Sequence, residues 1–211
     1  MPLVMTEKLT GIKGPMFSEK TTTLISRVHR AEHAGKNIKV FKPIVDDRWE
    51  MTEFIQSHNK VQLPATPVNN SVEIHEHVAL GETDFVAIDE AQFFDEQIVD
   101  VVRYLTDNDV EVVFSALPLD FKGEPFGPAP ILFAMADEIV NLTAICKHHD
   151  NGKICGREAT RTQRIVNGEP AHYTEPVILI GAEESYEARC IDHHEVPGRP
   201  EPKIVYKAPS E

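Results

Sequence analysis

Three groups of side chains in this sequence could carry out chemistry, and the first is a glycine-containing turn. Residues 14–21 read Gly14-Pro15-Met16-Phe17-Ser18-Glu19-Lys20-Thr21. The phosphate-binding pattern is Gly, four residues and then Gly-Lys-Ser/Thr. Its backbone N–H groups cradle phosphates, its lysine reaches the outer phosphates and its hydroxyl holds Mg²⁺. The segment therefore predicts a site for a nucleotide, although a plain strand-turn-helix connection would also explain it.

The departure from that pattern is Glu19, which stands where the second glycine is expected. If this position needs a positive φ, a residue other than glycine costs about 1 kcal/mol there. A carboxylate beside the phosphates adds repulsion unless it turns outward. An attenuated or inactive nucleotide-binding protein is therefore the alternative to an active enzyme.

The second group is an acidic pair, Asp89 and Glu90, which directly follows the apolar run Phe85–Ile88. An acidic residue at the tip of a buried strand coordinates Mg²⁺, usually through water, and the next carboxylate can serve as a base. The pair could instead begin a solvent-facing loop. Because both motifs occur in the expected order, each after a predicted strand, a phosphoryl-transfer site is favoured.

The third group consists of cysteines and histidines beyond residue 145. The chain has three cysteines, an odd number that does not suit a disulfide framework. Zn²⁺ takes four ligands in a tetrahedron, commonly from two close pairs. Cys190 and His193 form one pair, and Cys146 joins either Cys155 or His149 in the other. Four protein ligands leave no open position on the ion, which predicts a structural site rather than a catalytic one. His148 and His194 are expected to be solvated.

Composition limits the classes of function. The 211 residues carry 21 Lys and Arg against 34 Asp and Glu, which gives a net charge of −13. This balance argues against affinity for nucleic-acid polymers, which requires clustered basic residues. No stretch approaches the roughly 18 apolar residues of a membrane span, and the first residues lack the apolar core of a signal peptide. We therefore expect a cytoplasmic protein without membrane contact.

The elements that must position these groups alternate between strand and helix. Strands are predicted at 9–13, 37–41, 85–88 and 110–115, and helices at 21–34, 71–80 and 96–105, with Ser71 as a helix N-cap. This alternation predicts an α/β fold, a P-loop NTPase-like parallel sheet flanked by helices. We expect this kinase domain to span 1–143, a zinc-binding lid domain 144–196 with a strand near 176–180, and a flexible tail 197–211.

Several blocks of the sequence resemble the zinc-containing, tetrameric class of thymidine kinases. The similar segments follow the family order from about residue 9 to residue 194, nearly the whole chain. They are Gly14–Ser18, Ile88–Phe94, Asp120–Gly127, Thr160–Arg164 and Ile180–Tyr186. The resemblance implies transfer of the γ-phosphate of ATP to the 5′-hydroxyl of thymidine, by a homotetramer that contains structural Zn²⁺. A zinc-ribbon interaction protein with a vestigial phosphate loop is a more distant alternative.

The resemblance also implies roles for individual residues. Glu90 would be the general base, and Asp89 would support Mg²⁺ near Lys20 and Thr21, with Gln92 nearby. Cys155 precedes Gly156 as a family ligand does, so the implied zinc set is Cys146, Cys155, Cys190 and His193. The implied thymidine contacts are Met16, Asp46, Arg48, Phe93, Leu117, Phe121, Phe126, Val177 and Tyr186. Pro118 departs from the aspartate that this family often has after the leucine, and we expect the stiff proline to alter how that loop closes over substrate.

Overall fold

A parallel sheet forms the centre of the computed structural model, which describes residues 8–44, 53–56, 60–178 and 186–202. Among these residues, six strands pair in the order β5-β2-β6-β7-β1-β8, and each pairing is parallel. The strands are β1 Leu9–Lys13, β2 Ile38–Pro43, β5 Thr66–Val68, β6 Phe85–Ile88, β7 Glu111–Ala116 and β8 Glu138–Asn141. The predicted α/β fold is confirmed.

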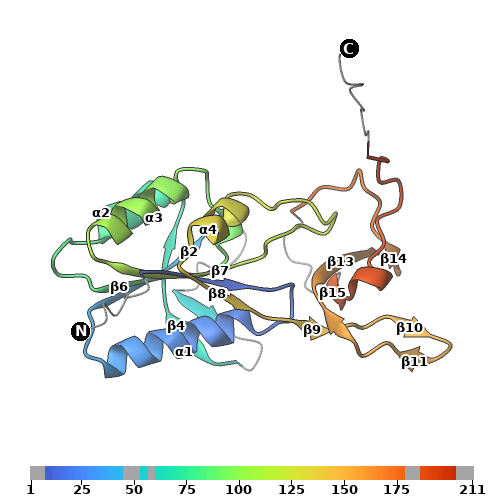
Figure 1. Ribbon diagram of the computed structural model, residues 1–211, viewed down its shortest axis with the longest axis horizontal. Helices are drawn as coiled ribbons and strands as arrows, with labels where there is room; N and C mark the ends of the chain where they lie inside the picture. The colour runs from blue at the N-terminus through green and yellow to red at the C-terminus, as the bar shows by residue number, and fades with distance from the viewer. Residues whose placement is uncertain (1–7, 45–52, 57–59, 179–185, 203–211) are drawn as a thin grey trace, which may run out of the picture.

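Helices cover both faces of this sheet (Figure 1). Helix α1, Lys20–His33, lies on one face, and α2 Ser71–His77, α3 Ile98–Asp107 and α4 Ala129–Met135 lie on the other. The apolar stripe of α1 at Leu24, Ile25 and Val28 is buried. This is the helical spacing that a helix needs to cover a sheet with one face.

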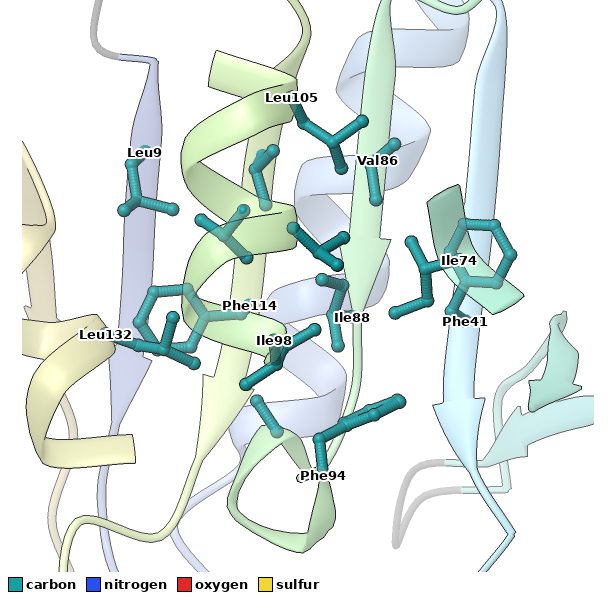
Figure 2. Close-up of a cluster of buried hydrophobic side chains, with 14 of the residues drawn as sticks. Leu9, Phe41, Ile74, Val86, Ile88, Phe94, Ile98, Leu105, Phe114 and Leu132 are labelled. Carbon is teal, nitrogen blue, oxygen red and sulfur yellow. The ribbon is translucent and has the colours of Figure 1, made fainter. Parts of the chain in front are cut away.

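Two apolar clusters fill the space between the sheet and its helices. Figure 2 shows the larger one, in which Phe114 of β7 and Leu132 of α4 lie near Ile88 of β6. The rings of Phe114 and Phe133 are 5.0 Å apart between centroids. A Cβ at Gly11 would approach both rings to 2.8 Å, so this strand position requires glycine.

The second cluster lies under α1 and includes a short hairpin. Strands β3, Phe54–Gln56, and β4, Gln62–Pro64, pair antiparallel and bury Ile55 and Leu63 against the α1 face. Together the two clusters bury an apolar core on both faces of the sheet. This core is sufficient to stabilise the first part of the chain by hydrophobic burial.

Beyond β8 the chain forms short antiparallel pairs that lie to one side of the sheet (Figure 1). The pairs are β9 with β12, β10 with β11, and β13 with both β14 and β15. Their bounds are β9 Ala144–Ile145, β10 His149–Asp150, β11 Lys153–Ile154, β12 Glu158–Ala159, β13 Arg161–Val166, β14 Glu169–Pro170 and β15 Tyr186–Arg189. We call residues 144–202 the lid unit.

Several elements differ from the sequence-based expectation. Helix α2 ends at His77 and its N-cap is Asn70, whose side chain accepts hydrogen bonds from the backbone N–H groups of Val72 and Glu73. The expected N-cap, Ser71, instead donates its hydroxyl to Asp95. Residues 176–178 are not a strand, and residues 179 and 180 lie outside the described residues. The described helices include none that is long and apolar enough to cross a membrane.

Candidate functional site

The phosphate loop lies at the edge of the sheet where the parallel strands end. Strand β1 ends at Lys13, and α1 begins at Lys20, so residues 14–19 form the turn between them. The Ser18 hydroxyl and the Lys20 ammonium both donate to the carbonyl oxygen of Pro15, at 2.8 and 2.9 Å. A Cβ at Gly14 would lie 2.3 Å from the Ser18 hydroxyl oxygen. The loop therefore closes on itself only because position 14 is glycine.

Glu19 has the left-handed conformation that the motif assigns to glycine, with φ 64° and ψ 29°. For a residue with a Cβ this conformation costs on the order of 1 kcal/mol. The carboxylate is exposed and accepts a hydrogen bond from the Thr22 hydroxyl, one turn into α1, at 2.5 Å. The strain expected at Glu19 is therefore present, while the charge is held outward against its own helix.

The acidic pair follows β6 at the same edge of the sheet. Asp89 is 6% exposed, and its carboxylate accepts hydrogen bonds from the hydroxyls of Ser115 and Thr21. Burial, together with the neighbouring charge of Glu90, raises the pKa of Asp89 to about 6. Lys20 is also buried, and this burial lowers its pKa although both carboxylates oppose the shift. A lysine and two carboxylates thus share a poorly solvated edge.

Glu90 is held in place by two neighbours. Its backbone is left-handed, with φ 50° and ψ 46°, and its N–H donates to the Ser115 hydroxyl. Its carboxylate accepts from the side-chain amide of Gln92 at 2.5 Å, while the amide oxygen of Gln92 accepts from the backbone N–H of Leu117 at 3.0 Å. Strained backbone held by hydrogen bonds is common at functional sites. Gln92 therefore orients Glu90 from a buried position.

A cavity of about 550 Å³ joins these groups. Three lysines, Lys20, Lys42 and Lys60, line it together with Asp89 and Glu90. Its wall continues through the phosphate loop to Phe93 and to the β3 strand. Positive charges and backbone N–H groups at a helix start suit a polyphosphate, and the carboxylates suit its metal ion.

The cysteine cluster belongs to the lid unit. The ligand atoms of Cys146, Cys155, Cys190 and His193 all lie within 4.8 Å of one another among the described residues. His193 Nδ1 is 3.4 Å from Cys190 Sγ and 3.7 Å from Cys146 Sγ. A tetrahedral zinc with Zn–S bonds near 2.3 Å places its sulfur ligands about 3.8 Å apart. The donor set and its size therefore fit Zn²⁺.

The surroundings shift the pKa values of Cys155 and Cys146 in opposite directions. A hydrogen bond from the Arg157 guanidinium, at 3.3 Å, lowers the pKa of Cys155 to about 6. Burial raises the pKa of Cys146, so that thiol gains most from a bound cation. The ring of His148 stacks on the ring of His193, with centroids 4.0 Å apart. His149 lies on the exposed β10 strand and is not part of the cluster.

The family model for thymidine kinase matches residues 7–194, most of the chain. The chain belongs to the thymidine kinase family. It is an enzyme, a nucleoside kinase, and its function is that of a thymidine kinase. The phosphate loop, the acidic pair and the Cys₃His cluster all lie within the matched residues.

The structure brings some of the expected nucleoside contacts to the cavity. Met16 and Phe93 line it, and the ring of Phe126 meets that of Phe93 edge to face, with centroids 5.3 Å apart. Leu117 is buried, and its backbone N–H donates to the side-chain oxygen of Gln92, the residue that holds Glu90. Phe121 is 2% exposed and belongs to the loop that follows; among the described residues, it is not one of those that line the cavity, nor are Leu117 and Phe126.

Other expected contacts lie elsewhere. Tyr186 lines a neighbouring hollow of about 440 Å³, with Phe17, Glu19 and Lys147, rather than the cavity of Glu90. Val177 is half-buried in the lid unit. Asp46 and Arg48 lie outside the described residues.

Sequence reasoning missed three residues that support the site. Ser115 contacts both acidic residues, and Thr162 of β13 accepts a hydrogen bond from the backbone N–H of Met16 at 3.1 Å. A Cβ at Gly127 would lie 2.3 Å from the carbonyl oxygen of Gln92. Ser115 could have been predicted from the sequence, because the end of the strand beside β6 must lie next to the acidic pair. Thr162 lies in the Thr160–Arg164 block that resembles the family, but no local signal predicted its contact with Met16, which is 146 residues away.

Proposed function

We propose that this thymidine kinase transfers the γ-phosphoryl group of ATP to the 5′-hydroxyl of thymidine, with Glu90 as the general base. The observation that carries the proposal is the shared cavity. Glu90, which follows β6, and Lys20, the first residue of α1, line the same 550 Å³ cavity together with the phosphate loop. A base and a phosphate site must both reach the reacting atoms, so this arrangement is the one that transfer requires.

On the phosphate side, residues 14–19 supply backbone N–H groups and Lys20 supplies a charge. Lys42 and Lys60 line the same cavity and add to the positive field around a triphosphate. Thr21 and Asp89, whose oxygens lie 3.3 Å apart at the closest, offer the hard oxygen ligands that Mg²⁺ prefers. When bound there, Mg²⁺ would neutralise charge on the β- and γ-phosphates.

On the nucleophile side, Glu90 receives a proton. The 5′-oxygen of thymidine forms a bond to the γ-phosphorus, and the bond from phosphorus to the oxygen of the ADP leaving group breaks. The proton of the 5′-hydroxyl passes to the Glu90 carboxylate. Gln92 holds that carboxylate in position, so its orientation is set before substrate binds.

For the nucleoside, we propose that Phe93 stacks on the thymine ring. Leu117, Phe121, Phe126 and Met16 would complete that pocket, Val177 and Tyr186 would border it when the lid unit closes, and Asp46 and Arg48 would lie near the reacting groups. The edge-to-face contact of Phe93 with Phe126 supports this role, because it fixes the plane of the Phe93 ring.

For the metal cluster, we propose a structural Zn²⁺ held by Cys146, Cys155, Cys190 and His193. Four protein ligands leave no open position, so the ion would contribute folding energy rather than chemistry. Assembly into a homotetramer, the boundaries at 143 and 196 and a cytoplasmic location stay predictions from the sequence.

The test is ATP-dependent formation of thymidine monophosphate, with and without Mg²⁺, by the wild-type protein and by Glu90→Gln. We expect the variant to lose roughly 10²- to 10⁴-fold in kcat while it still binds both substrates, because a base is lost with little change in volume. Glu96→Gln, an exposed carboxylate of the next segment, is the matched control and should behave as wild type. Near-normal kcat in Glu90→Gln would refute the role of the base. Binding without turnover in the wild type would favour the attenuated alternative.

A further inference from the structure

The loop that presents Phe121 is a tight unit organised by Asp120. The buried Asp120 carboxylate accepts hydrogen bonds from the backbone N–H groups of Lys122 and Glu124, at 2.8 and 3.0 Å. The backbone of Asp120 also pairs with Glu124 and Gly123, and Leu119 bridges to Pro125. Because residues 119–125 are tied to one another, a contact at any one of them positions the whole loop.

The contacts of this loop with the lid unit are polar and come from several elements. The guanidinium of Arg164, on β13, lies over the Phe121 ring at 5.6 Å and donates to the Pro176 carbonyl. The hydroxyl of Tyr173 donates to the carboxylate of Glu124 at 2.7 Å. The lid unit therefore holds both the Phe121 ring and the far side of its loop.

The most direct of these contacts comes from His194. Its Nε2 lies 2.8 Å from the carbonyl oxygen of Phe121. A carbonyl oxygen only accepts, so Nε2 is the donor. The expectation that His194 is merely solvated is therefore wrong.

His194 is itself held from both sides along the chain. The preceding residue, His193, belongs to the Cys₃His cluster. The following residue, Glu195, is bound through its backbone N–H and C=O to the side chain of Gln163, at 2.8 and 2.9 Å, and Gln163 is 1% exposed. An imidazole fixed in this way loses little entropy when it donates to Phe121, so the bond can set the position of the loop.

We propose that His194 is a positioning residue of the nucleoside pocket, which fixes the Phe121 loop through the Phe121 carbonyl and so connects the metal-bearing turn with thymidine binding. The proposal rests on the proposed function, because Phe121 is assigned there to the thymidine pocket. It goes further in naming the side chain through which the lid unit sets that pocket. We expect the nucleoside to be affected more than the phosphate donor, because the hydrogen bond of the His194 side chain goes to the Phe121 loop and not to the phosphate loop.

The test compares His194→Gln with His194→Asn. Both variants carry a neutral amide, but only the longer glutamine places its N–H near the position of Nε2, and asparagine falls short by one methylene. We expect His194→Asn to raise the KM and the dissociation constant for thymidine by roughly three- to tenfold, the loss of one buried hydrogen bond. The KM for ATP should change little in either variant, and His194→Gln should return thymidine binding close to the wild-type value. His33→Leu, an exposed histidine at the end of α1, is the control for loss of an imidazole.

Zinc content and thermal stability are measured on the same samples. Equal thymidine affinity in the wild type, His194→Gln and His194→Asn would overturn the proposal. An equal loss of affinity in the two His194 variants would also overturn it, since the length of the side chain would then not matter. Loss of zinc from His194→Asn with a parallel rise in both KM values would show a role in folding instead. Should the wild type bind thymidine without phosphorylating it, the transfer mechanism fails while the dissociation constants still decide the role of His194.

Discussion

The sheet unit and the lid unit of this protein are stabilised by different means. The sheet unit buries two apolar clusters, one on each face, with Phe114, Leu132 and Leu24 fully enclosed. The buried cluster of the lid unit consists of Ala144, Cys146, Ala159, Ala188 and Cys190, small side chains of which two are thiols. Small residues release little hydrophobic free energy on burial. We therefore expect the lid unit to depend on a metal ion held by the Cys₃His cluster and on polar contacts with the sheet unit.

We expect this difference to bear on the site, because the proposed base and phosphate residues all lie in the sheet unit, whereas Val177 and Tyr186 of the proposed nucleoside pocket lie in the lid unit. Asp89 and Glu90 directly follow β6, and Lys20 begins α1, so a packed core can hold all three within fractions of an ångström. The lid unit reaches this edge by longer-range contacts, such as that of Thr162 with Met16. A unit held by a few such bonds can move while the catalytic edge remains in place.

The largest expected effect is on the sheet unit, from Phe114→Ala. Phe114 is fully buried and packs on Phe133, so its loss leaves a cavity worth about 3–5 kcal/mol of unfolding free energy. Thermal unfolding should show a large fall in midpoint, while the zinc content of the folded protein stays unchanged. A variant that loses zinc at temperatures where the sheet is still folded would mean that the two units are stabilised together.

A second prediction concerns the chemistry of the sheet edge, through Ser115→Ala. The Ser115 hydroxyl donates to the Asp89 carboxylate and accepts the N–H of Glu90, so its loss leaves the buried Asp89 carboxylate with one hydrogen-bond donor fewer, the Thr21 hydroxyl remaining. Hydrogen bonds to charged groups contribute about 1.5–3 kcal/mol, which predicts a fall in kcat of roughly ten- to a hundredfold. Ser115→Thr keeps the hydroxyl and should lose less. Steady-state kinetics that instead show a rise in the KM for thymidine alone would contradict the separation of roles.

The smallest effect is expected at Glu19, where the phosphate loop borders the hollow that Tyr186 and Lys147 of the lid unit also line. Glu19→Gly relieves a left-handed backbone, which is worth up to about 1 kcal/mol of strain. Because the carboxylate already faces Thr22, the gain from removing its charge is small, and kcat/KM for ATP should rise by less than about tenfold. Glu19→Ala is the control that removes the charge and keeps the Cβ. Unchanged or poorer kcat/KM in the glycine variant would show that Glu19 is accommodated and does not attenuate the enzyme.

The sequence predicted the sheet unit well because its signals are local. The run Phe85–Ile88 is fully buried in β6, and α1 differs by one residue at each end from the predicted 21–34. The N-cap of α2 was misassigned by one residue, because Asn70 and Ser71 are both good caps and only the contact of Ser71 with Asp95 decides between them. That contact spans 24 residues and leaves no local signal.

The lid unit was predicted less completely because its signals are long-range. Most of its strands are two residues long, too short to show an alternation of apolar and polar residues. The described residues near Pro176 do not form the expected strand, and the Pro176 carbonyl accepts a hydrogen bond from the Arg164 side chain instead. Spacing left both Cys155 and His149 open and the family resemblance favoured Cys155, and in the structure the hairpin of β10 and β11 brings Cys155 back to Cys146. The roles of His194 and His148 depend on partners far along the chain.

The most direct test of this account is to remove the metal and ask which unit responds. Freshly purified protein should contain one zinc per chain, as expected for a Cys₃His site. After chelation, amide hydrogen exchange should increase in β9 to β15 and remain slow in β1, β6 and β7, with a higher KM for thymidine and a nearly unchanged KM for ATP. Protein without stoichiometric zinc, or exchange that rises equally in both units after chelation, would contradict the account.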